Sequence, residues 1–334
     1  MTPSAPEVTS GIQPKSVLIL GGSGFIGTKL AALMIERQLP FRIGDLRPSP
    51  SFPQQWTECD VRKPESLTQI AAGSSAIINL AAEHRDDVYP ISRYHETNVG
   101  GAVQVCAAAR AMGIAKIVFT SSAAVYGFHP YPVDEDGPFD PFNAYGKTKL
   151  EAESVYRAWA AEDPSRTLVI VRPTVVFGEG NRGNVYNLLR QIASRRFVMV
   201  GSGTNFKSMA YVGNVAAFLE HALSLRGGRH IFNYVDLPDM MINELVRYVS
   251  QCLKRPGKIY SFPRPIAMAG AHVLDALARL TGKTFPISAV RIRKFCENTQ
   301  FLAGKALQSG FVPPYTLNEG LARTIQSEFF QEKN

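Results

Sequence analysis

The chain has 334 residues, of which 45% are hydrophobic and 19% are charged, as in ordinary globular proteins. This composition excludes a collagen-like, coiled-coil or wholly disordered chain, and the length predicts about two domains. The net charge of +8 is unevenly distributed, with 16 Lys/Arg against 19 Asp/Glu in residues 1–179 and 20 against 9 in residues 180–334. The basic second half indicates an anionic partner, which is a nucleotide phosphate, a nucleic acid or a membrane surface, and the alternative is a basic face that is simply solvated.

Sequence signals for export and for metal binding are weak. The four cysteines form no CxxC pair and the six histidines have no zinc-site spacing, so we expect a reducing compartment and no metal. The first 15 residues are polar and lack the apolar stretch of a signal peptide, which predicts a disordered tail. No later run is long and apolar enough for a stable membrane span. These features together predict a cytoplasmic protein.

Short apolar runs alternate with helical periodicity through the first half of the chain, a pattern typical of βαβ units and a parallel sheet. Because such crossovers are right-handed, the pattern predicts a doubly wound, Rossmann-type α/β fold. The predicted strands are Ser16–Leu20, Phe41–Asp45, Ala76–Leu80, Lys116–Thr120 and Leu168–Val171, and the predicted helices are Lys29–Arg37 and Val99–Met112.

The second half is predicted to form a smaller, mostly helical substrate region over the carboxyl edge of the sheet. Its helical patterns cover Val185–Ser194, Gly213–Leu225, Asn243–Leu253 and Ala267–Leu280, whereas Ile231–Val235 is interpreted as a last sheet strand. The two domains therefore interleave. The sheet domain is expected to comprise residues 16–180 and about 205–235, and the substrate domain about 181–204 and 236–334.

The most apolar stretch of this half, Pro265–Leu280, is too short and too polar to cross a membrane. It contains His272, Asp275 and Arg279, so we predict a packed helix. Attachment of this helix to a membrane interface is the alternative.

A glycine-rich turn follows the first predicted strand and opens a helix, with the sequence GGSGFIG at residues 21–27. Gly21 suits the tight turn, Gly24 lets the backbone approach a pyrophosphate, and Gly27 permits close packing of helix and strand. The free N–H groups at the start of the helix, around Phe25 and Ile26, favour phosphate. This strand–turn–helix context predicts a dinucleotide site.

Acidic residues after the second strand narrow the choice of dinucleotide. Asp45 ends that strand, where a carboxylate binds the adenosine ribose hydroxyls and repels a 2′-phosphate, so NAD is favoured over NADP. Arg47, two residues later, keeps NADP as the lesser alternative. Asp60 and Val61 are placed to hold the adenine edge, although an ordinary loop aspartate fits Asp60 equally well.

A Ser–Tyr–Lys set follows in the order expected of a proton-transfer site. Tyr145 and Lys149 lie one helical turn apart on one face, and a neighbouring ammonium is expected to lower the pKa of the phenol. Such a phenol can act as a general acid or base at a sugar or alcohol oxygen, and Lys149 can also bind the nicotinamide ribose. Ser121 and Ser122 end a strand at the edge where open α/β sheets bind ligands.

With these motifs in order, the sequence resembles the extended short-chain dehydrogenase/reductases, in the NAD-dependent epimerase/dehydratase group typified by UDP-galactose 4-epimerase. The resemblance runs from about Ser16 to Glu328. Its further landmarks are NLAAEH (79–84), Asn98, TSSAAVYG (120–127), YGKTK (145–149), RPTVVFG (172–178), KSMAYVGNVAAF (207–218) and KALQSGFVP (305–313).

The resemblance implies roles for individual residues. Ser122, Tyr145 and Lys149 match the catalytic set, and Asn184 and Lys207 match residues that contact the substrate diphosphate. Members of this family also commonly form homodimers through a four-helix bundle, here near Val99–Met112 and Tyr145–Glu162. The positions that would contact or hold the cofactor are Gly21, Gly24, Phe25, Ile26, Gly27, Asp45, Asp60, Val61, Leu80, Ala81, Ala82, Asn98, Tyr145, Lys149 and Pro173.

Two departures from the family pattern limit the possible reactions. Dehydratases carry an Asp-Glu pair where this chain has Ala123-Ala124, so dehydration is not expected. UDP-galactose 4-epimerases usually carry an asparagine where this chain has Val175, which leaves galactose specificity open.

The resemblance implies an NAD-dependent epimerase acting at C4 of a UDP-hexose or UDP-N-acetylhexosamine through a transient 4-keto sugar, for glycan precursor synthesis. Its partner is then a nucleotide-sugar, and no nucleic acid partner is expected. One alternative is an NAD(P)H-dependent 4-ketoreductase of a 6-deoxy nucleotide-sugar. A second is a non-catalytic dinucleotide-binding or RNA-binding protein, against which the intact Ser122, Tyr145 and Lys149 argue.

Overall fold

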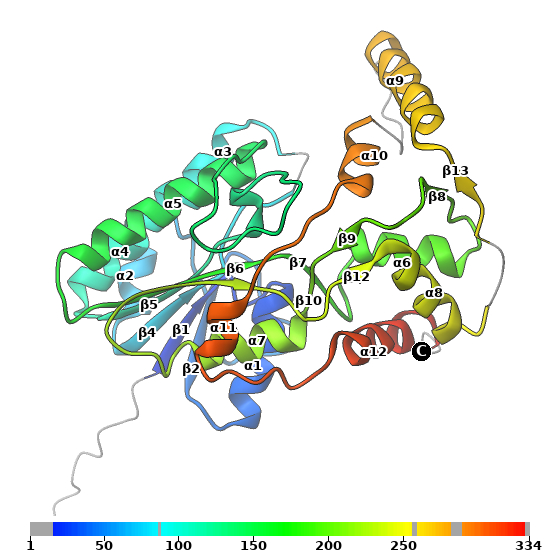
Figure 1. Cartoon of the computed structure of the whole chain (residues 1–334). Helices are drawn as coiled ribbons and strands as arrows, with labels where there is room; N and C mark the ends of the chain where they lie inside the picture. The colour runs from blue at the N-terminus through cyan, green and yellow to red at the C-terminus, as the bar shows by residue number, and fades with distance from the viewer. Residues whose placement is uncertain (1–15, 86–87, 256–258, 282–288, 331–334) are drawn as a thin grey trace, which may run out of the picture.

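The computed structural model describes residues 16–85, 88–255, 259–281 and 289–330. The predicted tail, residues 1–15, lies outside the described residues. Figure 1 shows a sheet body with helices on its faces and, beyond the sheet edge, a second lobe of short strands and helices.

The body is built on one parallel seven-stranded sheet in the order β11-β6-β5-β4-β1-β2-β3. The chain winds outward from β1 in both directions, so the predicted doubly wound Rossmann-type sheet is confirmed. The strands are β1 (Ser16–Leu20), β2 (Phe41–Asp45), β3 (Trp56–Glu58), β4 (Ser74–Asn79), β5 (Lys116–Thr120), β6 (Thr167–Pro173) and β11 (Gly228–Tyr234).

Helices cover both faces of this sheet. One apolar cluster joins α2, α4 and α5 to one face, and a second joins α1, α7 and α11 to the other. The central strands are therefore buried on both sides, which explains their nearly continuous apolar sequences. The helices of the body are α1 (Phe25–Glu36), α2 (Pro64–Ala71), α3 (Ser92–His95), the π-turn η1 (Glu96–Gly100), α4 (Gly101–Ala111), the 3₁₀ turn η2 (Ala123–Val125), α5 (Ala144–Ala161), α7 (Val212–His221) and α11 (Gly304–Gln308).

The last strand of the sheet returns to it from the second half of the chain. β11 pairs in parallel with β6 along its whole length, so the predicted strand at Ile231–Val235 exists and begins three residues earlier, at Gly228. The helix predicted at Gly213–Leu225 is α7, which packs on α1 beneath the sheet. Both segments thus belong to the body.

The second lobe has its own apolar cluster, built mainly by α6, α8 and α12. Short strand pairs tie it together, with β10 on β7, β12 on β9 and β13 on β8. Its elements are β7 (Val175–Phe177), α6 (Asn184–Ala193), β8 (Met199–Val200), β9 (Phe206–Lys207), β10 (Met209–Tyr211), β12 (Met240–Met241), α8 (Ile242–Cys252), β13 (Ser261–Phe262), α9 (Arg264–Thr281), α10 (Ala289–Cys296) and α12 (Leu317–Phe329).

The prediction of a packed helix at Pro265–Leu280 was wrong in one respect. The helix exists as α9, but it extends away from the lobe beside α10 and buries few of its side chains (Figure 1). Ala271 is buried, whereas Val273 and Leu280 are exposed. Apolar content correctly predicted a helix, but it could not show whether a neighbouring element would cover that helix. Within the described residues, no helix is sufficiently long and apolar to cross a membrane.

Candidate active site

The predicted cofactor and catalytic residues follow the carboxyl ends of the strands β1 to β6, on either side of β1, where the chain leaves the sheet in opposite directions. This position is where open α/β sheets bind ligands, because the diverging loops leave a crevice between them. The predicted substrate contacts Asn184 and Lys207 lie in the second lobe.

The glycine turn after β1 has the geometry that its sequence predicts. Gly21 has φ +74°, and a Cβ atom there would lie 2.6 Å from the backbone nitrogen of Ala81. A Cβ atom on Gly27 would lie 2.5 Å from Cα of Gly22. Only glycine fits at either position without moving backbone, so the turn is tight and α1 starts directly against it.

The start of α1 is open to an anion. No side chain caps the helix at Gly24, so its first N–H groups and the positive end of its dipole are available to phosphate. The buried hydroxyl of Ser23 also has no hydrogen-bond partner. An orphaned donor beside free backbone N–H groups fits a bound pyrophosphate.

Asp45 lies beside this turn at the end of β2. Its carboxylate accepts hydrogen bonds from the backbone N–H groups of Ser23 (3.1 Å) and Arg47 (3.0 Å). These bonds fix its orientation and leave lone pairs on both oxygens for further donors. The arrangement fits ribose hydroxyls, whereas a 2′-phosphate would face a carboxylate at short range.

The Asp60 carboxylate is held in an ion pair, whereas a side chain that binds adenine would have a free carboxylate. Arg62 binds its carboxylate with Nη2–Oδ2 at 2.7 Å and Nε–Oδ1 at 2.9 Å. The hydrogen bond from Arg62 lowers the pKa of Asp60. The pair lines a pocket of about 410 Å³ together with Lys63, Glu96 and Gln104, next to the buried Val61.

Two asparagine side chains hold the loop after β4 by hydrogen bonds to its backbone. Asn79 accepts a hydrogen bond from the backbone N–H of Ala81 (3.0 Å), and Asn98 binds the backbone N–H and carbonyl of Glu83 (2.9 and 3.1 Å). Asn98 also donates to the Thr148 hydroxyl at 3.0 Å. The segment Leu80–Ala82, which lies against Gly21, is therefore tied to α5, the helix that carries Tyr145.

The two serines after β5 point in different directions. Ser121 is buried and donates its hydroxyl to Glu153 at 2.6 Å, so it is part of the core. Ser122 caps the short turn η2 by accepting a hydrogen bond from the Ala124 N–H at 3.1 Å. Ser122 also lies close enough to Tyr145 to lower the pKa of its phenol in part. Ser122 is thus the serine that faces the predicted site.

Gly146 explains how Tyr145 approaches Ser122. A Cβ atom on Gly146 would lie 2.5 Å from the carbonyl oxygen of Ala124, so the absence of a side chain lets the first turn of α5 pack on η2. Asn143 caps the same turn by accepting a hydrogen bond from the Gly146 N–H at 2.9 Å.

The expected lowering of the Tyr145 pKa is contradicted. Burial raises the pKa of Tyr145, and the nearby Ser122 hydroxyl only partly offsets this effect. Burial also lowers the pKa of Lys149 to about 7, because desolvation disfavours the charged amine. The sequence placed the two groups correctly on one helix face, but desolvation outweighs their attraction.

Lys149 is oriented by β5, the strand that leads to Ser122. Its Nζ donates to the carbonyl oxygen of Thr120 at 2.6 Å and lies 4.5 Å from the centre of the Phe119 ring. Because these contacts come from β5, they fix the amine relative to Ser122 and Tyr145.

A buried ion pair lies behind the Ser–Tyr–Lys set, and the sequence analysis missed it. Arg172 and Glu153 have fully buried side chains and bind through two contacts, Nε–Oε1 at 2.8 Å and Nη2–Oε2 at 2.6 Å. Arg172 also donates to the Tyr126 hydroxyl at 2.6 Å. Burial raises the pKa of Tyr126 to about 12, so this hydroxyl stays neutral. Arg172 is the first residue of the landmark motif RPTVVFG, and Glu153 follows the motif YGKTK by four residues.

The proposed substrate side lies between body and lobe. Lys207 donates to the carbonyl oxygen of Glu297 at 2.6 Å, and burial lowers its pKa to about 8. Pro173 ends β6 below this segment, whereas Asn184 is an exposed residue at the start of α6. Lys207 therefore lies at the junction, whereas Asn184 lies at the exposed start of α6 in the lobe.

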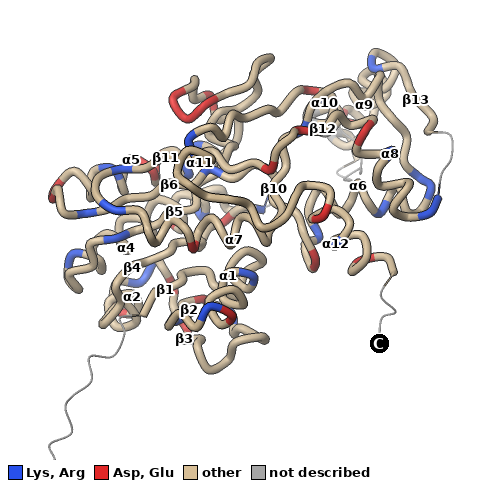
Figure 2. The backbone as a smooth tube through the Cα atoms, turned by 60° about the horizontal axis from the view of Figure 1, so that its bottom comes forward, with Lys and Arg blue, Asp and Glu red and all other residues tan. Residues whose placement is uncertain are grey.

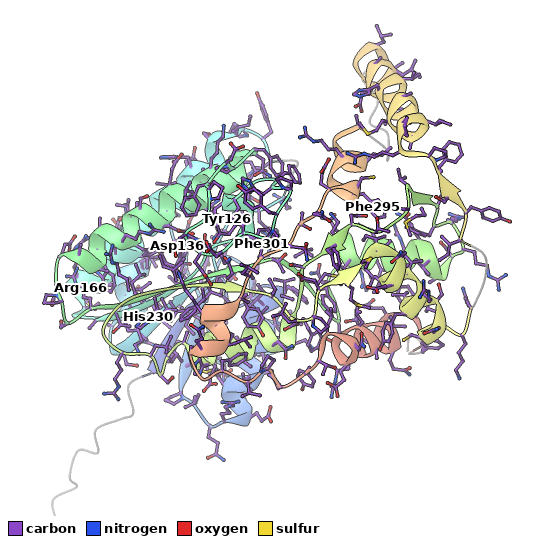
Figure 3. All side chains as sticks on the ribbon, viewed as in Figure 1. Tyr126, Asp136, Arg166, His230, Phe295 and Phe301 are labelled. Atoms are coloured by element: carbon purple, nitrogen blue, oxygen red, sulfur yellow. The ribbon has the colours of Figure 1, made fainter. Side chains whose placement is uncertain are left out.

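The segment after α10 connects the body and the lobe at this junction. The strand-like segment after α10 forms bridges to both halves, with Phe301 opposite Val133 and Thr299 opposite Lys207. Figure 3 shows Tyr126 and Phe301 together at the centre of the molecule, where their ring centres lie 5.5 Å apart.

Comparisons with known proteins agree with this geometry. A model of the "NAD dependent epimerase/dehydratase family" matches residues 17–234. An Escherichia coli O157:H7 protein, N-acetyl-alpha-D-glucosaminyl-diphospho-ditrans,octacis-undecaprenol 4-epimerase, is 48% identical, covering 95% of this chain and 96% of its own. A Vibrio cholerae UDP-glucose 4-epimerase is 27% identical, covering 96% of this chain and 97% of its own.

Solved structures show the same fold. MoeE5 in complex with UDP-glucose and NAD has a TM-score of 0.74 and 25% identity, with 93% of this chain and 98% of that chain covered. A UDP-N-acetylglucosamine 4-epimerase from Bacillus cereus has a TM-score of 0.76 with coverage of 96% and 98%, and at 14% identity it supports the fold alone.

Proposed function

The chain belongs to the NAD dependent epimerase/dehydratase family, and we propose that it is a 4-epimerase of an N-acetylhexosamine carried on a diphosphate. The observation that carries this proposal is the 48% identity to the undecaprenol-linked GlcNAc 4-epimerase over nearly the whole of both chains. The substrate that it favours is therefore GlcNAc-diphospho-undecaprenol.

The cofactor is NAD, as the family is NAD dependent. The free start of α1, the orphaned Ser23 hydroxyl and the oriented Asp45 carboxylate fit its pyrophosphate and adenosine ribose. When bound, the cofactor supplies the acceptor and donor of the hydride at the sugar C4.

The protein side of the reaction is proton transfer and positioning. Because burial favours the neutral phenol in the cofactor-free chain, Tyr145 must first lose its own proton. As the phenolate it takes the proton from the sugar O4 hydroxyl and later returns it, and Ser122 hydrogen-bonds the same oxygen. Lys149 stabilises the deprotonated phenol, since its amine is held by Thr120 on the same strand end that presents Ser122. Turning the 4-keto sugar over between the two transfers inverts C4.

The diphosphate is the anionic part of the substrate, and its negative charge complements the basic second half of the chain. We propose Lys207, with Asn184 at the start of α6, as its contacts, because Lys207 lies at the junction of body and lobe. A nucleotide diphosphate and a polyprenyl diphosphate offer the same anion there, so the carrier must be recognised elsewhere.

Two alternatives remain from the sequence. A UDP-linked hexose or N-acetylhexosamine is the alternative substrate, supported by the Vibrio cholerae relative and by the UDP-glucose in MoeE5. Reduction of a 4-keto-6-deoxy sugar uses the same residues but consumes NAD(P)H. A dehydratase is disfavoured, because Ala123 and Ala124 occupy the turn after Ser122 and offer no acid or base.

The experiment compares carriers directly. Purified protein with no added cofactor is incubated with GlcNAc-diphospho-undecaprenol in detergent or with UDP-GlcNAc, and the C4 epimers are resolved by NMR while NADH absorbance is followed. We expect epimerisation of the lipid-linked sugar without net NADH change. Turnover of UDP-GlcNAc alone would shift the assignment to a nucleotide-sugar epimerase, and net NADH consumption would refute an epimerase.

We also propose a homodimer and a cytoplasmic location. The family's four-helix bundle would use α4 and α5, which pack side by side and leave Val103 of α4 exposed. All four cysteines are free thiols, in keeping with a reducing compartment. Light scattering of wild type and Val103→Glu would test the dimer.

A further inference from the structure

Helix α9 carries its apolar stripe on the side that faces away from the protein. Ile266, Val273, Leu277 and Leu280 are 57%, 59%, 42% and 83% exposed. At 3.6 residues per turn, these four positions fall within about 60° of one another around the helix. They therefore form one continuous stripe along a helix of 18 residues.

The opposite side of α9 contacts α10 and is also largely apolar, with Ala271 buried and Ala267, Met268, Leu274 and Ala278 half-buried. Asp275 accepts a hydrogen bond from the backbone N–H of Ala289 at 3.1 Å, and Arg264 binds Glu297 at 2.7 Å. The one buried side chain of the helix among those described is the small Ala271. A surface helix normally buries its apolar side. α9 covers one apolar side against α10, but its outer stripe has no partner within the described chain.

Aromatic residues continue the exposed surface at the base of the helix. Tyr260 and Phe262 are exposed in and beside β13, and β13 pairs with β8 next to the exposed Val198. Exposed rings beside an aliphatic stripe are typical of surfaces that enter a membrane interface. We call Tyr260, Phe262 and the four stripe residues the α9 surface.

The segment around this surface is strongly basic. Residues 254–296 contain nine Lys/Arg and a single acidic residue, Asp275, giving a net charge of +8. This equals the net charge of the whole chain, so the rest of the protein is neutral. Figure 2 shows Lys and Arg at the outer edge of the lobe, around α8, β13 and α9. Such charge complements an anionic lipid surface.

We propose that the α9 surface docks the enzyme on an anionic lipid bilayer, with α9 lying in the interface. This inference rests on the proposed function in one respect, since an undecaprenol-linked sugar resides at a bilayer. An anionic bilayer suits both the apolar stripe and the basic segment. A second copy of this basic chain or a neutral isoprenoid tail could cover the stripe, but neither supplies the negative charge that the basic segment requires.

The lobe connects this surface to the substrate junction. α10 packs beside α9 and leads to Glu297, whose carboxylate binds Arg264 of α9 and whose carbonyl accepts from Lys207. Arg293 of α10 lies 5.9 Å from the Phe128 ring, next to the segment that follows Tyr126. Docking α9 would thus hold the junction near the headgroups, where a lipid diphosphate lies.

The test is binding of the full chain to vesicles, which needs no substrate. We expect co-sedimentation with vesicles of phosphatidylglycerol and phosphatidylethanolamine, weakened by added salt and much weaker with phosphatidylcholine alone. The variant Val273→Asn with Leu280→Asn should bind at least about tenfold more weakly, because two apolar side chains no longer enter the interface. The matched control, Ile35→Asn with Val312→Asn, replaces two exposed apolar residues elsewhere and should bind like wild type.

Three results would overturn the proposal. One is equal vesicle binding, or none, for wild type and the α9 variant. Another is a wild-type oligomer that the α9 variant dissociates while vesicle binding is unchanged, which would assign the stripe to a second copy. The third is unchanged vesicle binding with a raised KM for the long-chain substrate alone, which would assign it to the isoprenoid tail.

The proposed function is tested separately. The α9 variant should keep the wild-type kcat on a short-chain, water-soluble GlcNAc diphosphate lipid, which shows that it is folded. A wild-type protein that binds vesicles through α9 but does not epimerise any GlcNAc diphosphate would refute the function and leave the docking surface standing.

Discussion

Replacing Lys149 by methionine should abolish epimerisation and yet stabilise the cofactor-free protein. Lys149 is 2% exposed, and burial lowers the pKa of its amine from 10.5 to about 7. In the unfolded chain the amine regains an ordinary pKa, so between about pH 7 and pH 10.5 the unfolded state binds more protons. Over that window the stability of wild type rises with pH, and at pH 7 the buried amine costs about 4 kcal/mol.

The stability that the protein gains when the Lys149 amine is removed is smaller than the cost of burying that amine. Methionine loses the hydrogen bond from Nζ to the Thr120 carbonyl, a charge-assisted bond that contributes about 1.5–3 kcal/mol. The net expectation for Lys149→Met is a stabilisation of about 1–3 kcal/mol at pH 7 that disappears as the pH approaches 10.5.

Urea unfolding of cofactor-free protein at a series of pH values measures this difference. Lys147→Met is the matched control, because Lys147 is exposed on the same helix two residues earlier and its replacement should leave stability nearly unchanged. A Lys149→Met protein that is less stable than wild type at pH 7, or whose gain does not shrink with rising pH, would refute the reasoning.

Three further replacements test the site and its support. Gly27→Ala puts a Cβ atom 2.5 Å from Gly22 Cα, so α1 must shift and NAD affinity, measured by calorimetry, should fall about tenfold or more; unchanged affinity would contradict the close approach. Ser122→Ala should lower kcat by about 10²–10³ with little change in thermal stability, because it removes one donor to the reacting oxygen; a large loss of stability instead would make Ser122 structural. Glu153→Gln should cost about 3–5 kcal/mol in urea unfolding, because it leaves the Arg172 guanidinium buried without its carboxylate; a cost below 1 kcal/mol would show that water or another group replaces it.

Local patterns were sufficient for the nucleotide half of the protein. β1, β2 and β5 have the predicted boundaries. β1 and β5 are short apolar runs that end at glycine or polar residues, as strands buried on both faces do, and β2 ends at Asp45. The glycine turn was equally readable, since its conformation is set within a few residues of the backbone. The short edge strand β3 and the helix α2 were missed, because neither has an apolar run long enough to stand out from the loops around it.

The pKa values of the site residues and the exposure of α9 depend on contacts between residues far apart in the chain. Spacing placed Tyr145 beside Lys149, but only the folded environment shows that burial raises one pKa and lowers the other. The Glu153–Arg172 pair joins a helix to a strand 19 residues later, a contact that no local pattern encodes.

Helix α9 shows the same division. Its apolar periodicity was plain from the sequence, and this alone predicted a packed helix. The fold packs the side that carries Ala271 and Asp275 against α10 and leaves the other apolar side, with Val273 and Leu280, exposed. The periodicity of the sequence determines that a helix has an apolar side. Whether that side is covered is decided by the tertiary structure, because burial depends on which other segments of the chain pack against the helix.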